Sequence, residues 1–295
     1  GLAKEVRPVT VTTYQILTWR RRKTDPFIHF ELFSRNDWGL VIYDEVHLLP
    51  APVFRVTADL QATRRLGLTA TLVREDGHEE DVFTLIGPKR YDLPWKVLER
   101  KGWIAEALCR EVRVPMDADL KKRYALVGSR ARFLLAAENR GKEPLLHTLV
   151  EQHNDDKILV IGQYLDQLDK VARTLEAPII TGRTPKPDRL DLYGRFRDGD
   201  LRVLVVSKVG NFAVDLPEAS VIIQISGTFG SRQEEAQRLG RILRPKRDGR
   251  QARFYTVVAR DTIDTEYAAH RQRFLAEQGY GYVIQDADDL LGPAI

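Results

Sequence analysis

Cysteine and methionine are nearly absent from this sequence, which holds one of each, Cys109 and Met116. A single cysteine cannot form a disulfide within the chain, and it indicates a reducing compartment. No apolar run approaches the ~18 residues that a membrane-spanning helix requires, and no signal peptide opens the chain. With 43% hydrophobic and 30% charged residues, we expect a soluble, cytoplasmic globular protein without membrane contact.

An initiator methionine is also missing, because the chain starts at Gly1. Its first residues lead directly into "PVTVTTYQIL", whose alternating β-branched residues predict a strand followed by a turn. A chain that begins inside a domain is the expectation from this start.

The order of apolar runs is typical of an α/β protein. "VIYDEVHLL" and "ATRRLGLTATLV" predict two short strands in the first part of the chain, and the apolar run of the first predicts a buried parallel strand. "CREVRVPM", "KILVIG", "APIIT", "RVLVVS", "SVIIQIS" and "ARFYTVVA" predict a second parallel sheet whose strands alternate with helices. Turn residues between Gly87 and Gly102 predict a linker. We therefore expect two α/β units, residues 1–93 and 94–295, with a basic helical insertion in the second over about 117–142.

Two adjacent carboxylates, Asp44 and Glu45, follow the first of these apolar runs, and His47 comes two residues later. Open α/β sheets bind their ligands at the carboxyl ends of their strands. The chemistry suggested is metal-assisted hydrolysis of a nucleoside triphosphate, although a motif this short also fits a capped loop after a strand. No G-x-x-x-x-G-K-[ST] phosphate loop occurs anywhere in the sequence.

A second motif, "EEAQRLGRILRP", lies far downstream. On a helix, Gln237, Arg241 and Arg244 would share one face. Gly240 between them would allow close approach, and two arginines aimed the same way suit a triphosphate. The alternative interpretation is a basic amphipathic helix.

The motifs occur together and in order in one family. The chain resembles the carboxy-terminal half of XPB-type helicases, from superfamily 2 of the DNA helicases, in its bacterial members. The matching segments are "TTYQIL", "DEVH", "GLTATLVRED", "IGPKRYDLPWKVLERKGWIA", "VSKVGNFAVDLPEA", "QISGTFGSRQEEAQRLGRILRPK" and "YAAHRQRFLAEQGYGYVI". The resemblance implies two RecA-like parallel-sheet lobes, the first truncated, with a thumb-like insertion in the second. In this family the phosphate loop lies upstream of the part that begins here.

The resemblance also implies ATP and Mg²⁺ as cofactors. Asp44 would hold the metal through water, and Glu45 would orient or deprotonate the attacking water. His47 would face Gln237 across the cleft, and the pair would couple nucleotide state to lobe closure. The remaining assignments are Arg241 and Arg244 at the γ-phosphate, Asp215 and Gly240 at the nucleotide, and Thr69 and Thr71 as the link between hydrolysis and DNA contacts.

DNA contacts follow from the same resemblance. Hydroxyl, amide and basic groups suited to a sugar-phosphate backbone stand at Thr12, Thr13, Tyr14, Gln15, Ser207, Lys208 and Asn211. Tyr14 also fits a core aromatic, and the family commonly has an acid where Asn211 stands. Arg74, Glu75 and Asp76 match the family's duplex-opening signature. The thumb would contribute Lys121, Lys122, Arg123, Arg130 and Arg132, for which a solvated helix face is the alternative interpretation.

We therefore expect an ATP-dependent 3′-to-5′ DNA helicase or translocase, associated with the nucleoid and acting in repair or transcription-linked duplex opening. The net charge of +4 does not by itself demonstrate a nucleic-acid partner. Two alternatives remain, the motor subunit of a restriction-type nuclease with a nuclease partner, and a module that only binds DNA or a protein. The 295 residues alone are expected not to hydrolyse ATP, because they contain no phosphate loop.

Overall fold

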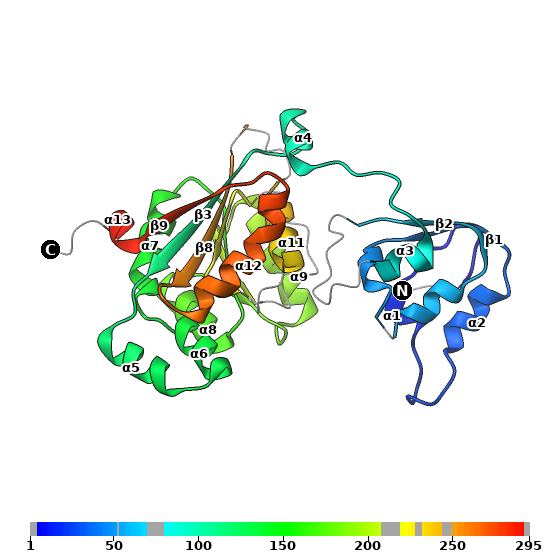
Figure 1. Cartoon of the computed structure of the whole chain (residues 1–295), viewed down its shortest axis with the longest axis horizontal. Helices are drawn as coiled ribbons and strands as arrows, with labels where there is room; N and C mark the ends of the chain where they lie inside the picture. The colour runs from blue at the N-terminus through cyan, green and yellow to red at the C-terminus, as the bar shows by residue number, and fades with distance from the viewer. Residues whose placement is uncertain are drawn as a thin grey trace. The chain divides into compact units, whose positions relative to one another are not determined.

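The computed structural model divides into two compact units, Gly1–Asp92 and Leu93–Ile295, each of which is described by itself (Figure 1). The structure describes residues 5–51, 53–69, 80–207, 219–227, 232–243, 249 and 251–291. The division falls one residue from the predicted boundary. Within these described ranges, the helices are too short or too polar to cross a membrane.

Unit 1 is built on a two-stranded parallel sheet, in which β1 (Trp38–Tyr43) pairs with β2 (Ala62–Gly67). Its core packs Tyr43, Val46, Leu49, Ala58 and Val82 together. The other elements are α1 (Tyr14–Leu17), α2 (Ile28–Ser34), α3 (Glu80–Ile86) and the 3₁₀ turns η1 (Val46–Leu48) and η2 (Arg55–Asp59).

Two expectations for unit 1 were wrong. The alternation near Val9 and Val11 forms no strand; these side chains are 87% and 96% exposed, and Thr13 instead caps α1 by accepting a hydrogen bond from the N–H of Ile16. β1 is not fully buried, since Leu40 and Ile42 are 50% and 54% exposed. The cause in both places is that an apolar pattern becomes a buried strand only where a neighbouring strand or layer covers it.

Unit 2 contains a seven-stranded sheet with the order β5-β6-β4-β7-β8-β3-β9, and all of its pairings are parallel. The predicted α/β class with parallel sheets is therefore confirmed. β9 lies in a segment that the apolar runs did not single out. The strands are β3 (Ala107–Val114), β4 (Ile158–Gly162), β5 (Ile179–Ile180), β6 (Val203–Ser207), β7 (Val221–Gln224), β8 (Ala252–Ala259) and β9 (Tyr282–Asp286).

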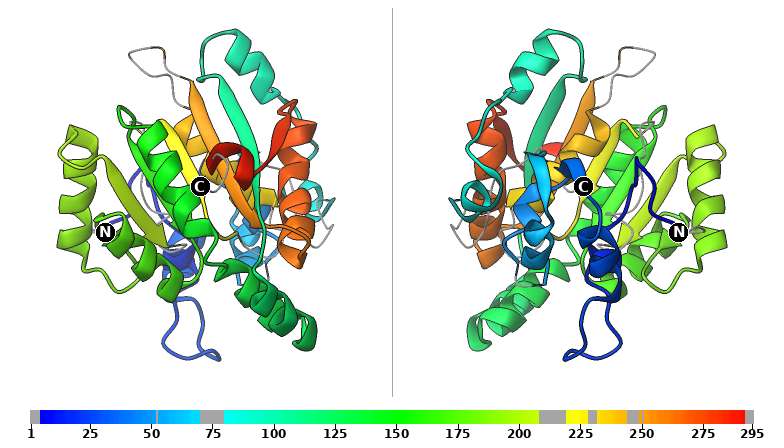
Figure 2. Two further views of the ribbon diagram at one scale, coloured as in Figure 1. Left: turned by 90° about the vertical axis from the view of Figure 1, so that its left-hand side faces the viewer. Right: turned by 90° about the vertical axis from the view of Figure 1, so that its right-hand side faces the viewer.

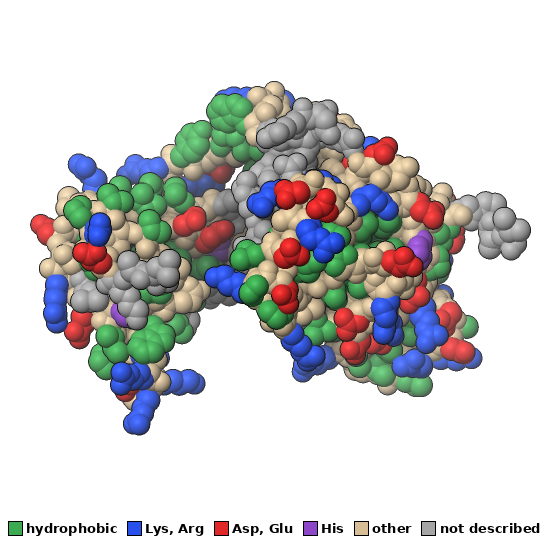
Figure 3. Space-filling view, turned by 180° about the vertical axis from the view of Figure 1, so that it is seen from behind, with side chains coloured by type: hydrophobic (Ala, Val, Ile, Leu, Met, Phe, Trp, Pro, Cys, Tyr) green, Lys and Arg blue, Asp and Glu red, His purple; other side chains and the backbone are tan. Residues whose placement is uncertain are grey.

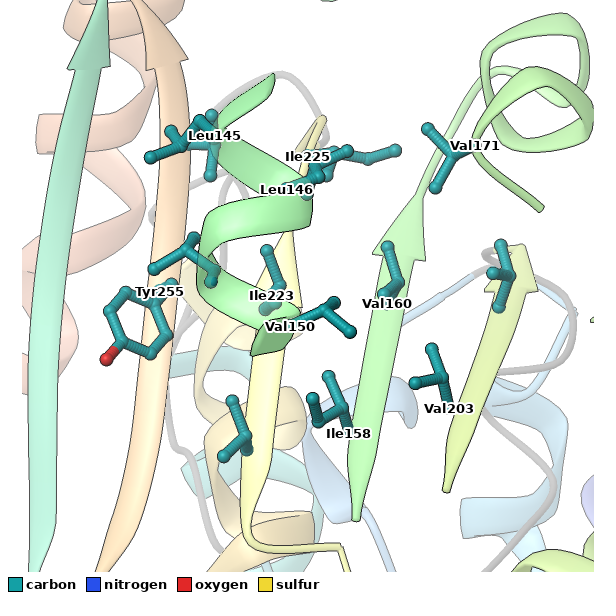
Figure 4. Packing of buried hydrophobic residues seen from close by; sticks show 14 of the residues in the cluster. Leu145, Leu146, Val150, Ile158, Val160, Val171, Val203, Ile223, Ile225 and Tyr255 are labelled. Atoms are coloured by element: carbon teal, nitrogen blue, oxygen red, sulfur yellow. The ribbon is translucent and has the colours of Figure 1, made fainter. Parts of the chain in front are cut away.

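Helices cover both faces of this sheet (Figure 2). On one face, Leu145, Leu146 and Val150 of α7 pack over Ile158 and Ile223 (Figure 4). On the other face, α11 and α12 pack against each other and contact β8. Coverage on both sides explains why β4, β6 and β7 are buried along their whole length. The helices of unit 2 are α4 (Trp95–Arg100), α5 (Ala118–Leu126), α6 (Ser129–Ala137), α7 (Lys142–Gln152), α8 (Leu165–Thr174), α9 (Lys186–Asp198), α11 (Arg232–Ile242), α12 (Ile263–Glu277) and α13 (Ala287–Leu291).

Candidate functional site

The two acids predicted for hydrolysis lie directly after β1. Glu45 has a left-handed backbone with φ 48° and ψ 48°, a conformation uncommon in residues other than glycine. Its N–H donates a hydrogen bond of 3.0 Å to Oδ1 of Asp44. The chain therefore turns sharply at the carboxyl end of the parallel pair, where open α/β sheets bind ligands.

His47 joins the ends of both strands of unit 1. It is 2% exposed, and its Nδ1 lies 2.9 Å from the hydroxyl of Thr69, just beyond β2, and 3.4 Å from Oε2 of Glu45. The N–H of Val46 donates to the carbonyl of Leu68 at 3.0 Å. The structure thus brings Asp44, Glu45, His47 and Thr69 into one group, which we call the acid cluster.

Electrostatics of the acid cluster suit a bound cation. Partial burial, with the nearby Asp44 carboxylate, raises the pKa of Glu45 above its ordinary value. A divalent ion would offset that repulsion. The described residues hold no group of three or more acidic, histidine or cysteine side chains that could bind a metal. The donor set of two adjacent carboxylates, Asp44 and Glu45, fits Mg²⁺, which takes one or two protein carboxylates and completes its shell with water and phosphate oxygens.

Tyr14 connects α1 to the acid cluster. Its hydroxyl donates a 2.7 Å hydrogen bond to the backbone carbonyl of Asp44, and its ring lies 5.4 Å from that of Phe54. Burial raises the pKa of Tyr14, which keeps the hydroxyl a donor. These contacts fit the core-aromatic interpretation, whereas Thr13 and Gln15 beside it are exposed.

In unit 2, α11 carries Gln237, Gly240 and Arg241. Glu235, Arg238, Leu239 and Ile242 form its buried face. With 3.6 residues per turn, positions 237 and 241 lie on a different side of α11, and Gln237 is half-buried there. Gln237 therefore lies off the buried face of α11; the side chain of Arg241 lies outside the described part.

A buried polar network, which the sequence did not predict, holds α11 in place. Glu235 accepts hydrogen bonds from Gln224 at 2.9 Å and from Tyr282 at 3.3 Å, and it lies 3.6 Å from Nε of Arg271 on α12. A side chain at Gly227 would collide with the guanidinium of Arg271. Because the partners come from β7, β9 and α12, only folding brings them together, and no local pattern signals them.

The insertion of residues 117–142 begins as an ordered helix pair, α5 and α6. The hydroxyl of Tyr124 accepts a 2.7 Å hydrogen bond from the N–H of Ile263, which fixes α5 to α12. Arg132 packs its guanidinium over the Tyr124 ring and donates to the Tyr124 carbonyl at 3.2 Å, so it holds the two helices together. The remaining predicted thumb cations are exposed, namely Lys121, Lys122, Arg123 and Arg130.

The remaining predicted site residues are buried, half-buried or outside the described part of the chain. Ser207 ends β6 and is 3% exposed, so it offers no surface hydroxyl of the kind predicted. Thr12 is half-buried just before α1. Outside the described residues lie Thr71, Arg74, Glu75, Asp76, Lys208, Asn211, Asp215 and Arg244.

Comparisons with known proteins give a consistent family. A family model described as ERCC3/RAD25/XPB C-terminal helicase matches residues 98–290. The chain is 62% identical over 295 residues to a DNA 3′-5′ helicase XPB of Mycobacterium tuberculosis, covering 100% of this chain and 53% of that protein. It is 60% identical over 292 residues to its namesake in Kineococcus radiotolerans, covering 99% of this chain and 52% of that protein. The chain thus spans about half the length of these curated relatives.

The solved structures support the fold. Dbp5 of Saccharomyces cerevisiae, bound to RNA and ADP BeF3, aligns with a TM-score of 0.58 at 15% identity, covering 85% of this chain and 60% of that one. At this identity the likeness shows the fold alone, that of RecA-like helicase domains.

Proposed function

Because the chain belongs to the ERCC3/RAD25/XPB C-terminal helicase family, we propose that it is part of an ATP-dependent 3′-to-5′ DNA helicase or double-strand translocase. The observation that carries this proposal is the acid cluster, in which two carboxylates, a buried histidine and a threonine meet at the carboxyl edge of parallel strands.

In this proposal Glu45 orients the attacking water and accepts its proton. The sharp turn after β1 places the Glu45 carboxylate beside Asp44 at the carboxyl end of the strand pair, where a bound ligand would lie. His47, held against Thr69, fixes the position of the cluster. Mg²⁺, held through water by Asp44, would supply neutralisation of phosphate charge.

The side of α11 that bears Gln237 and Arg241 supplies the second set of groups. Arginine side chains at positions 241 and 244 would stabilise charge on the γ-phosphate, the role of an arginine finger. Asp215 and Gly240 are proposed at the nucleotide, and Thr71 beside Thr69 in coupling. These assignments rest on the family, and for Gln237 also on its place outside the buried face of α11.

DNA is the proposed partner, which would associate the protein with the nucleoid. Exposed Thr13 and Gln15 and the insertion's cations offer groups for a sugar-phosphate backbone. The duplex-opening role of Arg74, Glu75 and Asp76 and the DNA contacts of Lys208 and Asn211 remain predictions. A nuclease partner is not part of the proposal.

A hydrolysis assay tests this function on two proteins side by side. One is the 295-residue chain; the other is a chimera in which the upstream portion of the Mycobacterium tuberculosis relative precedes this chain. We expect no ATP turnover by the chain alone at any DNA concentration, since it lacks a phosphate loop, and DNA-stimulated turnover by the chimera. A chimera that binds DNA but whose hydrolysis does not respond to it would contradict the proposal.

A further inference from the structure

The loop between α1 and α2 carries four consecutive cations, Arg20 to Lys23. It projects beyond both helices in Figure 1, and basic side chains gather at its end in Figure 3. Neither the acid cluster nor the predicted DNA contacts include these residues. We call Arg21, Arg22 and Lys23 the basic tip.

Local contacts hold the basic tip in a defined shape. The N–H of Arg22 donates to Oδ2 of Asp25 at 3.0 Å, and the N–H of Asp25 donates to the carbonyl of Arg22 at 3.1 Å. At the base of the loop, the Arg20 guanidinium lies 4.9 Å from the centre of the Phe27 ring. The loop is thus a closed turn, and its three end cations stay close together.

Among the described residues, no ion pair neutralises the side-chain charges of the basic tip, although the Asp25 carboxylate, which accepts a hydrogen bond from the N–H of Arg22, lies beside them. Three exposed cations elsewhere in unit 1 form ion pairs with carboxylates, namely Arg7, Arg35 and Lys89. In the part of the chain that the structure describes, the tip cations form no such pair, and all three are exposed. Adjacent like charges repel one another, so an external polyanion would lower the free energy of the tip.

An aromatic side chain adjoins the tip. Trp19 is 47% exposed, and its ring centroid lies 5.9 Å from that of His29. Proteins that bind single-stranded nucleic acid combine cations that track the backbone with aromatic rings on which bases stack. The loop directly follows α1, which carries the exposed Gln15 proposed to contact DNA.

We propose that the basic tip and Trp19 form a further DNA-binding site, which holds the phosphates of single-stranded DNA and stacks one base. This site extends the proposed function and rests on it. None of its contacts reads a base edge, so it binds without sequence preference.

Salt titrations of the full chain on one mixed-sequence single-stranded oligonucleotide test the site. Each lost phosphate contact lowers the slope of log K against log salt by about 0.7 on single strands. Three triple-alanine variants, each of which removes three positive charges, are compared. The tip variant replaces Arg21, Arg22 and Lys23, and the insertion variant replaces Lys121, Arg123 and Arg130. The control variant replaces three cations that are exposed on α8 and α9, namely Lys170, Arg173 and Lys186.

The tip variant should flatten the slope by about 2 if three phosphates are held, and the control variant should leave it nearly unchanged. The insertion variant reports on the proposed function instead. If it flattens the slope and the tip variant does not, the tip site is wrong and the proposed function stands. If the wild-type chain does not bind the oligonucleotide, the tip site and the proposed function both fail. If the tip and control variants flatten the slope equally, only net charge matters and the tip site is wrong.

Two single substitutions check the result independently of the triple variant. Trp19→Ala should weaken binding about tenfold, as expected for the loss of one stacked base, whereas Trp19→Phe should keep most of the affinity. Asp25→Asn keeps the acceptor that closes the turn but removes the negative charge beside the tip, and it should tighten binding. Unchanged affinity in both Trp19→Ala and Asp25→Asn would overturn the site.

Discussion

Glu45 shows at the scale of one residue how the fold positions a reactive group. A left-handed conformation at a residue other than glycine costs on the order of 1–3 kcal/mol. The neighbouring contacts offset this cost, since Val46 packs closely on Gly67 and its N–H bonds to the Leu68 carbonyl. The turn is therefore fixed by its surroundings, and it places two carboxylates at the strand end.

Which single residues could be predicted from the sequence depended on how local their contacts are. Asp44, Glu45 and His47 form a contiguous motif after an apolar run, and they do lie together. The bond between Tyr14 and Asp44 spans 30 positions, so no spacing signals it. Lys142 ends the predicted basic insertion, yet it is 2% exposed and its Nζ lies 3.3 Å from Oδ2 of Asp264.

A pH effect on stability is expected from His153. Burial lowers its pKa below the ordinary value, and Arg253 and Arg110 act in the same direction, against the bond to Asp156. The unfolded chain, with a histidine pKa near 6.5, therefore takes up the proton first, and stability falls as pH drops below about 6.5. The measurement is the free energy of unfolding in urea at about pH 7.5 and about pH 5.5.

His153→Gln serves as the control for this effect because glutamine does not titrate. Between the two pH values, the free energy of unfolding of the variant should fall less than that of wild type. At about pH 7.5 the variant should be less stable than wild type, because it loses the hydrogen bond between His153 and Tyr255. Equal losses in both proteins would show that His153 contributes nothing to the pH dependence.

At the scale of elements, strands covered on both faces were predictable and uncovered ones were not. β4, β6, β7 and β8 are mainly apolar and are buried along all or nearly all of their length, because helices pack on each side of them. Before α1, apolar and hydroxyl-bearing β-branched residues alternate, which is also typical of a strand, but Val11 is 96% exposed. The residue pattern shows which segments favour a strand, but a segment becomes a buried strand only where a layer of helices covers it.

The stability of unit 2 should depend on Arg271 of α12. Arg271 is fully buried beside Glu235 and Asp264, and removing one partner of a buried ion pair costs about 3–5 kcal/mol because the other charge stays uncompensated. Arg271→Ala should lower the free energy of unfolding by that amount. Arg273→Ala on the same helix, exposed and paired with Glu277, should change it by less than about 1 kcal/mol. Similar small effects in both variants would mean that the network does not stabilise the unit.

At the scale of the whole molecule, the groups proposed for hydrolysis come from distant parts of the chain. Asp44 and Glu45 belong to unit 1, and Gln237 and Arg241 belong to unit 2. The 295 residues contain no phosphate loop, and the relatives are about twice as long. Activity is therefore expected only where this chain is joined to a segment that supplies the loop.

The most direct test of the central claim is the effect of Glu45→Gln on kcat for ATP hydrolysis by the chimera, with saturating DNA. Glutamine keeps the size of the side chain but cannot accept the proton, so kcat should fall by about 10²–10⁴-fold. Glu31→Gln, at an exposed acid on α2, should leave kcat unchanged. If Glu45→Gln hydrolyses ATP as fast as the unsubstituted chimera, the acid cluster is not the hydrolytic site.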